Sequence, residues 1–361
     1  MYLEKANYTN DKKQQTQNTT NNKPRIYWID FTRGFACLFV LLVHSPFPYI
    51  GQDGRFILGF MTYLGQTGGS NIFFMISGAV MLYRERETFP FLKKQLLKIV
   101  PPVIVWTFIF LLINCFIYKE FDSNTLLKKI LMIPFGTQEP TFWFIYVLIG
   151  IYLLTPILSY FLNRASQKEI TFYLFIWALS TLIPYLNFID ENIGKHLTHK
   201  VGWLYYFNGY IGYAVLGFYC RKFITIYYKK WKHCIIFTFT MCICLPIILN
   251  YLECPTSVIC NRLSLHEVLM SFSIFVLLKN YIKPHKYSHY LTKFARFTFG
   301  IYLVQGIFIK ILRLFLNPFK LNYFIQIPLT ILILGICSFS LVWLVSRFPY
   351  SKYIVGPVRE K

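Results

Sequence analysis

The chain has 361 residues, of which 55% are hydrophobic, 20% are aromatic and only 14% are charged. Soluble proteins carry about 25% charged residues, so this composition excludes a soluble enzyme or a nucleic-acid-binding module. A helix that spans a bilayer needs roughly 20 apolar residues, and hydrophobic stretches recur along the whole chain. The formal net charge of +22 therefore belongs to the loops of a polytopic membrane protein, and no nucleic-acid partner is expected.

The first 25 residues are polar, rich in Asn, Gln, Thr and Lys, and without apolar periodicity. Such a segment cannot bury enough surface to offset its ordering entropy, which predicts a disordered cytoplasmic tail over 1–25. Beyond it we predict an all-α domain of ten transmembrane helices over 26–346 and a cytoplasmic C-terminal tail over 347–361. The spans are expected at 26–47, 63–83, 99–118, 141–162, 169–189, 203–220, 233–252, 264–282, 297–316 and 323–346.

The second span has the weakest hydrophobic signal, because residues 66–71 (Gln-Thr-Gly-Gly-Ser-Asn) dilute its first half. Polar atoms and paired glycines at that depth need protein or a water-filled cavity around them rather than lipid. We therefore expect this segment to be enclosed by the rest of the bundle.

The lysines and arginines predict the orientation of the spans. With the N-terminal tail in the cytoplasm, 26 of the 37 cations lie on that side, 8 on the opposite side and 3 within spans. This distribution follows the positive-inside rule, and an even number of spans then places both termini in the cytoplasm. The cytoplasmic cations would face anionic head groups, so membrane lipids are expected partners.

The nine cysteines do not predict a metal site, because no C-x-x-C motif is present and Cys242 and Cys244 lie within an apolar span. Most of the cysteines are expected to pack as small hydrophobic side chains. Cys254 and Cys260 share a predicted outer loop, where their spacing allows a disulfide without requiring one.

Ionisable residues within spans cost at least a few kcal/mol each and usually mark function. The first span carries Asp30, Arg33 and His44. Asp30 and Arg33 can pair on one helix face, and Arg33 and His44 lie on the same stripe about 16 Å apart. An extended CoA arm, with phosphates at one end and a thioester at the other, has a comparable length. Alternatively, Arg33 and His44 snorkel to opposite head-group layers, and the spacing alone does not separate these two interpretations.

Five motifs in order along residues 25–345 resemble the acyltransferase 3 family of bacterial membrane proteins. They are RIYWIDFTRGFACLFVLLVH over 25–44, NIFFMISG over 71–78, KKQLLKIVPP over 93–102, WFIYVLIGIYLLTP over 143–156 and TFGIYLV over 298–304. The first motif is especially similar to that of O-acetyltransferases that modify enterobacterial common antigen and other surface polysaccharides. The resemblance implies a ten-span protein of the bacterial inner membrane that transfers acyl groups to cell-surface sugars.

The family's functional assignments fall on Arg33 and His44 of this chain, and we add Asp30 to the candidate catalytic set. Acyl transfer to a hydroxyl needs a base for the acceptor O–H, which imidazole provides near neutral pH, or a covalent carrier of the acyl group. The sequence does not distinguish these two roles. Ser77, Asn71 or Arg33 could donate hydrogen bonds to the developing oxyanion.

The candidate CoA-binding residues are cations of the first span and of the following basic loop. Ordinary anchoring at the membrane surface explains the loop cations at least as well, residue by residue. The set comprises Arg33, Arg84, Arg86, Lys94 and Lys98.

Two positions depart from the family's motifs. Gln305 stands where the late motif usually ends in His, and Thr141 stands where the fourth-helix motif often begins with His. Gln can hydrogen-bond but does not titrate near neutral pH, so any acid–base role of that position is lost or carried elsewhere. Since His266 is the only other histidine expected within a span, we expect the chemistry to concentrate on His44.

The remaining intramembrane ionisable residues lie near the outer ends of the late spans. Glu267 could line the acceptor side of the protein or reach the membrane interface, and the interface is slightly favoured. Lys310 and Arg313 are expected to snorkel toward the outer head groups.

The sequence therefore predicts a membrane O-acyltransferase that uses acetyl-CoA as acyl donor, needs no metal, and acts on a surface polysaccharide or its lipid-linked precursor. Its expected partners are acyl-CoA, this glycan or lipid-linked sugar acceptor, and membrane lipids, and a homo-oligomer is compatible with the sequence. The alternative is a glycan transporter or flippase, because short polar-interrupted spans also mark translocation pathways. The stripe of Asp30, Arg33 and His44 favours the transferase, because a flippase does not require it. A structural role in a host complex ranks third.

Overall fold

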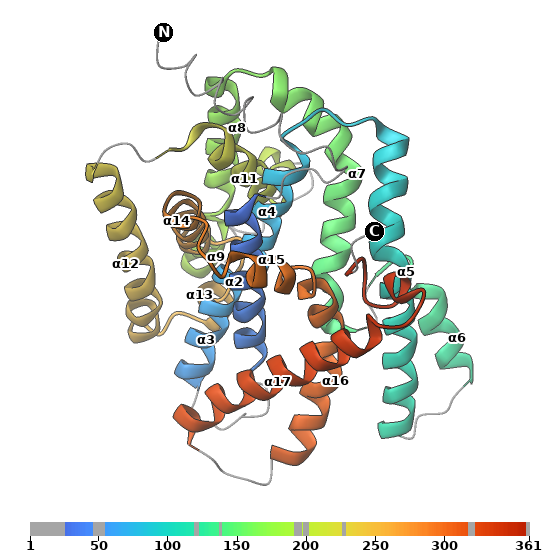
Figure 1. The fold of residues 1–361 in the computed structure, drawn as a ribbon. Coiled ribbons are helices and arrows are strands. Elements are labelled where there is room, and N and C mark those ends of the chain that lie inside the picture. The colour runs from blue at the N-terminus through green and yellow to red at the C-terminus, as the bar shows by residue number, and fades with distance from the viewer. Residues whose placement is uncertain are drawn as a thin grey trace.

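The computed structural model describes residues 26–45, 55–118, 123–136, 139–190, 197, 202–225, 229–316 and 322–358 (Figure 1). These residues form helices and no β-strand, which confirms the predicted all-α fold. The N-terminal tail expected over 1–25 lies outside the described residues.

Most helices begin and end within a few residues of the expected spans, but those at the second and third spans begin 8 and 11 residues earlier, at Arg55 and Thr88. The second, fifth and sixth spans are each built from two helical segments. The elements at the ten spans are α2 (Tyr27–His44), α3 (Arg55–Gly68) with α4 (Ser70–Met81), α5 (Thr88–Tyr118), α7 (Trp143–Arg164), α8 (Gln167–Ser180) with α9 (Ile183–Ile189), η3 (Trp203–Tyr206) with α11 (Ile211–Phe223), α12 (Lys229–Tyr251), α14 (Leu265–Tyr281), α16 (Thr298–Leu316) and α17 (Tyr323–Val345). The shorter connecting elements are α6 (Ser123–Met132), η2 (Pro140–Phe142), α13 (Thr256–Ile259), α15 (Ser288–Phe294) and η4 (Ser351–Tyr353).

Seven segments of the described chain are long and apolar enough to cross a membrane, so the protein is a multi-pass membrane protein. The expected spans without such a segment are the second, which is divided between α3 and α4, and those at α11 and α14, which have 13 and 17 residues. The count of ten spans and the cytoplasmic location of both termini remain predictions.

Helix α2 occupies the centre of the bundle, where it contacts α3, α4, α14, α15, α16 and α17 (Figure 1). Glycines on α3 allow the closest of these approaches. A β-carbon added at Gly65 would come within 2.6 Å of Val43, and one added at Gly68 within 2.3 Å of Phe39. Small residues at such contacts let helix backbones approach closely in a membrane.

The polar residues of the second span are enclosed by protein, as the sequence predicts. Gln66, Thr67, Ser70 and Asn71 are all buried in the bundle. The helix breaks at Gly69, between α3 and α4, so the polar residues lie on both sides of this break, next to α2.

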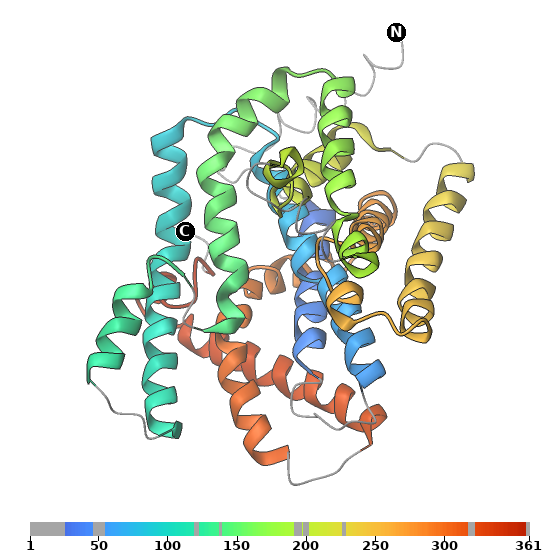
Figure 2. The same ribbon diagram turned by 180° about the vertical axis from the view of Figure 1, so that it is seen from behind.

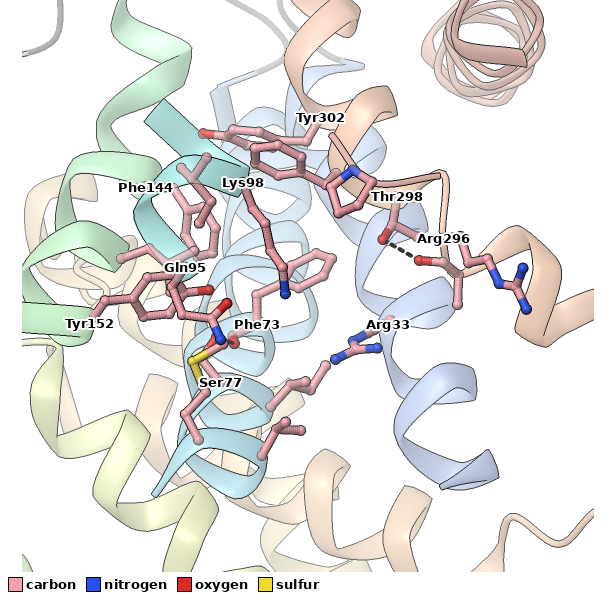
Figure 3. Close-up of a pocket in the computed structure, with 18 of the residues that line it drawn as sticks. Arg33, Phe73, Ser77, Gln95, Lys98, Phe144, Tyr152, Arg296, Thr298 and Tyr302 are labelled. Atoms are coloured by element: carbon pink, nitrogen blue, oxygen red, sulfur yellow. Dashed lines mark hydrogen bonds between the residues drawn. The ribbon is translucent and has the colours of Figure 1, made fainter. Parts of the chain in front are cut away.

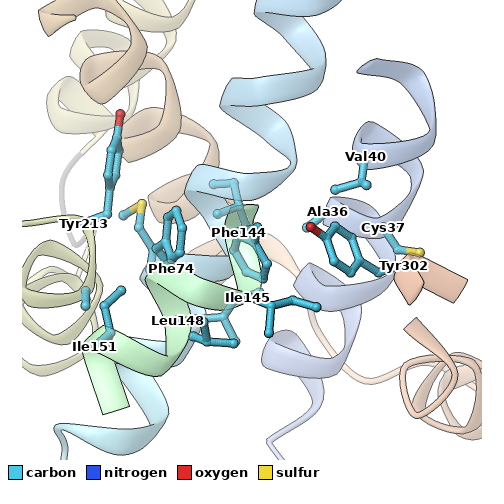
Figure 4. Close-up of a cluster of buried hydrophobic side chains, with 14 of the residues drawn as sticks. Ala36, Cys37, Val40, Phe74, Phe144, Ile145, Leu148, Ile151, Tyr213 and Tyr302 are labelled. Atoms are coloured by element: carbon cyan, nitrogen blue, oxygen red, sulfur yellow. The ribbon is translucent and has the colours of Figure 1, made fainter. Parts of the chain in front are cut away.

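Aromatic side chains join α4, α7 and α16 at the core of the bundle (Figure 4). The ring of Phe144 lies 4.6 Å from the ring of Phe74 and 5.6 Å from the ring of Tyr302, measured between centroids. Phe74 is fully buried and the other two rings are nearly so. Removing a ring of this kind typically costs about 3–5 kcal/mol of stability, so these contacts fix the relative positions of the three helices.

Helix α17 crosses the ends of α2 and α16 in both views of the ribbon (Figures 1 and 2). The segment that follows it turns back onto the bundle. The indole N–H of Trp106 donates a 2.7 Å hydrogen bond to the carbonyl of Ile354, and Val355 is buried. The described part of the expected C-terminal tail, up to residue 358, is therefore packed against α5 and α16.

Candidate active site

A cavity of about 390 Å³ lies between α2, α4, α5, α7, α16 and the segment after α17 (Figure 3). Its wall contains three cations and one carboxylate, namely Arg33, Lys98, Arg296 and Asp30. A cavity with this excess of positive charge favours an anionic ligand such as a phosphate group.

The predicted pairing of Asp30 with Arg33 is present at the α2 side of the cavity. Arg33 Nη1 donates a 3.1 Å hydrogen bond to Asp30 Oδ1, and the Asp30 side chain is buried while that of Arg33 is partly open. Lys98 enters from α5 and lies within electrostatic range of Arg33. Asp30 therefore orients Arg33, while Arg33 and Lys98 bring two positive charges to one space.

The other expected CoA-binding cations do not line the cavity. Arg86 donates from Nε to the carbonyl of Met81 at 3.0 Å and from Nη2 to that of Val80 at 3.2 Å, so it caps the end of α4. Its partial burial and the nearby charge of Arg84 lower the pKa of this guanidinium. Lys94 lies within electrostatic range of Lys98 but outside the cavity wall.

The sequence does not single out five polar members of the wall: Gln95, Tyr152, Arg296, Thr298 and Tyr302. Arg296 lies at the end of a basic loop, two residues before the late motif at 298–304. Gln95 lies in the motif at 93–102 and Tyr152 in the motif at 143–156, and membership of these motifs is the sequence feature that could have indicated them.

His44 continues the stripe of α2 that lines the cavity. Asp30, Arg33 and Val40 all belong to the wall, and His44 lies one helical turn, about 6 Å, beyond Val40. His44 itself is outside the wall residues. It is within electrostatic range of Arg262, a loop residue that precedes α14.

Gln305 occupies the corresponding level of α16. Helices α2 and α16 contact each other and run in the same direction (Figures 1 and 2), and Tyr302 of α16 lines the cavity. Gln305 lies three residues beyond Tyr302 and is fully buried. Neither polar atom of its side-chain amide has a hydrogen-bond partner among the described residues.

Two of the three expected oxyanion donors are engaged in other hydrogen bonds. Ser77 lines the cavity, but its hydroxyl donates to the carbonyl of Phe73 at 2.9 Å. The amide of Asn71 donates to Tyr213 at 3.1 Å and to Glu267 at 3.0 Å. Arg33 is the expected donor that the structure leaves facing the cavity.

Two expectations about the late spans are wrong. Glu267 does not reach the membrane interface: its exposed fraction is 0%, because α14 turns it inward against α4. Lys310 does not snorkel, because its ammonium forms a 2.8 Å ion pair with Glu139 and a 2.8 Å hydrogen bond with Asn114. A partner inside the bundle is more favourable for a charged group than a long reach to the head groups.

Arg313, in contrast, is exposed, as a snorkelling residue would be. The disulfide that the loop spacing allows is absent. Cys254 and Cys260 are both free thiols, and the Cys260 thiol instead donates to the carbonyl of Gly59 at 3.3 Å.

The five motifs that resemble the acyltransferase 3 family meet at this one cavity. Each contributes at least one wall residue, although the segments are spread over most of the chain. These residues are Arg33 from 25–44, Ser77 from 71–78, Lys98 from 93–102, Tyr152 from 143–156 and Tyr302 from 298–304.

Comparison with family models decides the family. Residues 26–347 match the acyltransferase 3 model, which is described as an acyltransferase domain. The chain belongs to this family. No curated protein and no solved structure matches the chain. The protein is thus a membrane acyltransferase, and the cavity formed by its motifs is the candidate active site of this acyltransferase domain.

Proposed function

We propose that the protein is a membrane-bound O-acyltransferase that moves an acetyl or other acyl group from acyl-CoA to a sugar hydroxyl. The acceptor in this proposal is a surface polysaccharide or its lipid-linked precursor, and the location is the bacterial inner membrane. The observation that carries the proposal is the convergence of all five motifs on a cavity with three cations and one carboxylate.

The cavity suits the phosphate-bearing part of acyl-CoA. Guanidinium groups bind phosphates through paired hydrogen bonds, and an ammonium adds a compact positive charge. Arg33 from α2 and Lys98 from α5 offer the two kinds of group to one space, and Arg296 adds positive charge at its edge (Figure 3). The volume of about 390 Å³ lies in the usual range for small-molecule sites.

The stripe of Arg33 and His44 on α2 defines how acyl-CoA would lie along the helix. Arg33 would hold the phosphates, and the pantetheine arm would follow the helix toward His44, about 16 Å further along. This length matches the separation between the phosphates and the thioester in the extended arm. The thioester would then lie at the turn of α2 that carries the imidazole.

At that turn, His44 would accept the proton of the acceptor hydroxyl as its oxygen attacks the thioester carbonyl. The carbon–sulfur bond breaks as the ester forms, and the CoA thiolate then takes up a proton. A covalent route in which His44 first carries the acyl group uses the same geometry. In both routes the imidazole must be reached by the donor from the cavity and by the acceptor from another side.

Binding of acetyl-CoA tests the proposal. Purified protein in nanodiscs should bind acetyl-CoA with an affinity that falls as salt is added, because phosphate contacts are largely electrostatic. Lys98→Ala should weaken binding about tenfold or more. Lys93→Ala is the matched control, since Lys93 lies on the same helix, carries the same charge and is exposed outside the cavity.

Loss of acylation in the cell provides the second test. Mass spectrometry of the surface glycan should show an acyl group that disappears when the protein is absent. Wild-type protein that binds no acetyl-CoA would contradict the proposal and favour a glycan flippase.

A further inference from the structure

A second buried polar cluster lies outside the cavity, between α4, α11, α14 and the loop before α14. The Asn71 amide donates to the Tyr213 hydroxyl at 3.1 Å and to Glu267 Oε2 at 3.0 Å. The Tyr213 hydroxyl in turn donates to the carbonyl of Arg262 at 2.5 Å. Asn71, Tyr213 and Glu267 each have an exposed fraction of 0%. None of the four residues lines the cavity that holds Arg33.

This cluster is incomplete. Within the described part of the chain, Asn71 Oδ1, Glu267 Oε1 and Arg262 Nε are buried and have no hydrogen-bond partner. Buried polar groups are almost always paired, so three orphaned atoms in one cluster call for a missing partner. Each unpaired buried group lowers the stability of the fold by its desolvation free energy, unless a bound molecule supplies the missing hydrogen-bond partner.

The orphaned atoms define the chemistry of that partner. Asn71 Oδ1 and Glu267 Oε1 are acceptors, and Arg262 Nε is a donor. A phosphate or carboxylate would bind the guanidinium but leave the acceptor Asn71 Oδ1 without a donor, and an ammonium group would be repelled by Arg262. A neutral hydroxyl both donates and accepts, so neighbouring hydroxyls of a sugar match the set.

Arg262 connects this cluster to the imidazole. Its guanidinium lies over the ring of Trp143, 4.4 Å from the centroid, which holds the side chain inside the bundle. It is within electrostatic range of Glu267 and of His44. Helix α4, which carries Asn71, contacts α2, and Gly65 of α3 packs against Val43, the residue before His44. A group bound to the cluster would therefore lie beside the turn of α2 that carries His44.

We propose that Arg262, Glu267 and Asn71 form the hydroxyl-binding subsite that holds the sugar acceptor beside His44. This inference rests on the proposed acyl transfer and assigns its acceptor side. The donor would reach His44 from the cationic cavity along α2, and the acceptor from the Arg262 cluster. The three residues are thus acceptor-binding residues that set which hydroxyl meets the imidazole.

The test separates acceptor binding from the rest of the reaction. Membrane vesicles from the producing strain, which supply the native glycan, are given radiolabelled acetyl-CoA, and label in the glycan fraction is counted. In parallel, purified protein is assayed for acetyl-CoA binding and for acetylation of hydroxylamine, a small nucleophile that needs no sugar subsite. The variants are Glu267→Gln and Arg262→Lys, which keep the size or the charge of the side chain.

We expect Glu267→Gln and Arg262→Lys to lower label in the glycan at least about tenfold. Acetyl-CoA affinity and hydroxylamine acetylation should stay within about twofold of wild type, because the donor cavity and His44 are intact. Glu139→Gln is the control, since it removes another buried carboxylate, the partner of Lys310. Its ratio of glycan to hydroxylamine acetylation should equal that of wild type.

Two results would overturn the subsite. One is normal glycan labelling by both variants. The other is a parallel loss of acetyl-CoA binding or hydroxylamine acetylation, which would make the cluster a structural support of the bundle. Failure of wild-type protein to bind acetyl-CoA would instead refute the proposed function itself.

Discussion

The close contact between α4 and α11 predicts that replacing its glycines with alanine destabilises the protein. A β-carbon added at Gly78 would lie 1.8 Å from the carbonyl oxygen of Ala214, and one added at Gly217 would lie 2.0 Å from that of Met75. Both obstacles are backbone atoms, which cannot rotate away. Gly78→Ala or Gly217→Ala therefore forces the two helices apart by about 1.5 Å before ordinary contact distances return. Overpacking of this kind typically costs about 1–3 kcal/mol.

Gly150 provides the matched control for this prediction. It lies within α7, and a β-carbon there would meet no atom within 4 Å. Thermal unfolding of detergent-purified protein should give lower midpoints for Gly78→Ala and Gly217→Ala, and an unchanged or higher midpoint for Gly150→Ala. Helix α4 also carries Ser77 of the cavity wall, so acetyl-CoA affinity should fall with stability in the first two variants. Equal midpoints for all three variants would refute the packing argument.

Three further predictions follow from other parts of the structure. His44→Gln should lower glycan acylation about 100-fold or more while expression and membrane insertion are retained, because Gln cannot take a proton; near-normal acylation would make His44 a structural residue. Lys310→Met should lower the unfolding midpoint, because it leaves the Glu139 carboxylate buried without its cation, and adding Glu139→Gln should restore part of the loss; a midpoint equal to wild type would mean that the pair contributes no stability. Cysteines introduced at Thr225 and Ser257 should be labelled from opposite sides of the membrane, and labelling from one side would refute the predicted topology.

Hydropathy and motif spacing predicted much of this fold. A helix lies at every expected span, because apolar runs of that length have few alternatives in a bilayer. The pair of Asp30 and Arg33 was also predictable, since its geometry depends only on the helical repeat. The enclosure of residues 66–71 followed from the cost of placing polar groups against lipid.

Other features depend on contacts between distant parts of the chain. Lys310 and Glu139 are 171 residues apart, and nothing local to either position indicates the other. Hydropathy places Arg262 in an outer loop, because a hydropathy profile does not show that this loop turns inward onto Trp143. Burial of Glu267 depends on which face of α14 meets α4. Because apolar residues lie on all sides of α14, their periodicity does not indicate which face is buried.

The wall of the cavity that holds Arg33 contains residues from Asp30 to Pro357, so the ribosome makes its first and last members far apart in time. While the ribosome is still producing α17, the segment that supplies Val355 and Pro357 has not yet emerged. A partly inserted chain therefore presents an open, unfinished cavity in which the thioester would have no closed wall around it. If acyl-CoA binds there as proposed, its use is delayed until the bundle is assembled, and a truncation before Val355 should give a protein that inserts but does not bind acetyl-CoA.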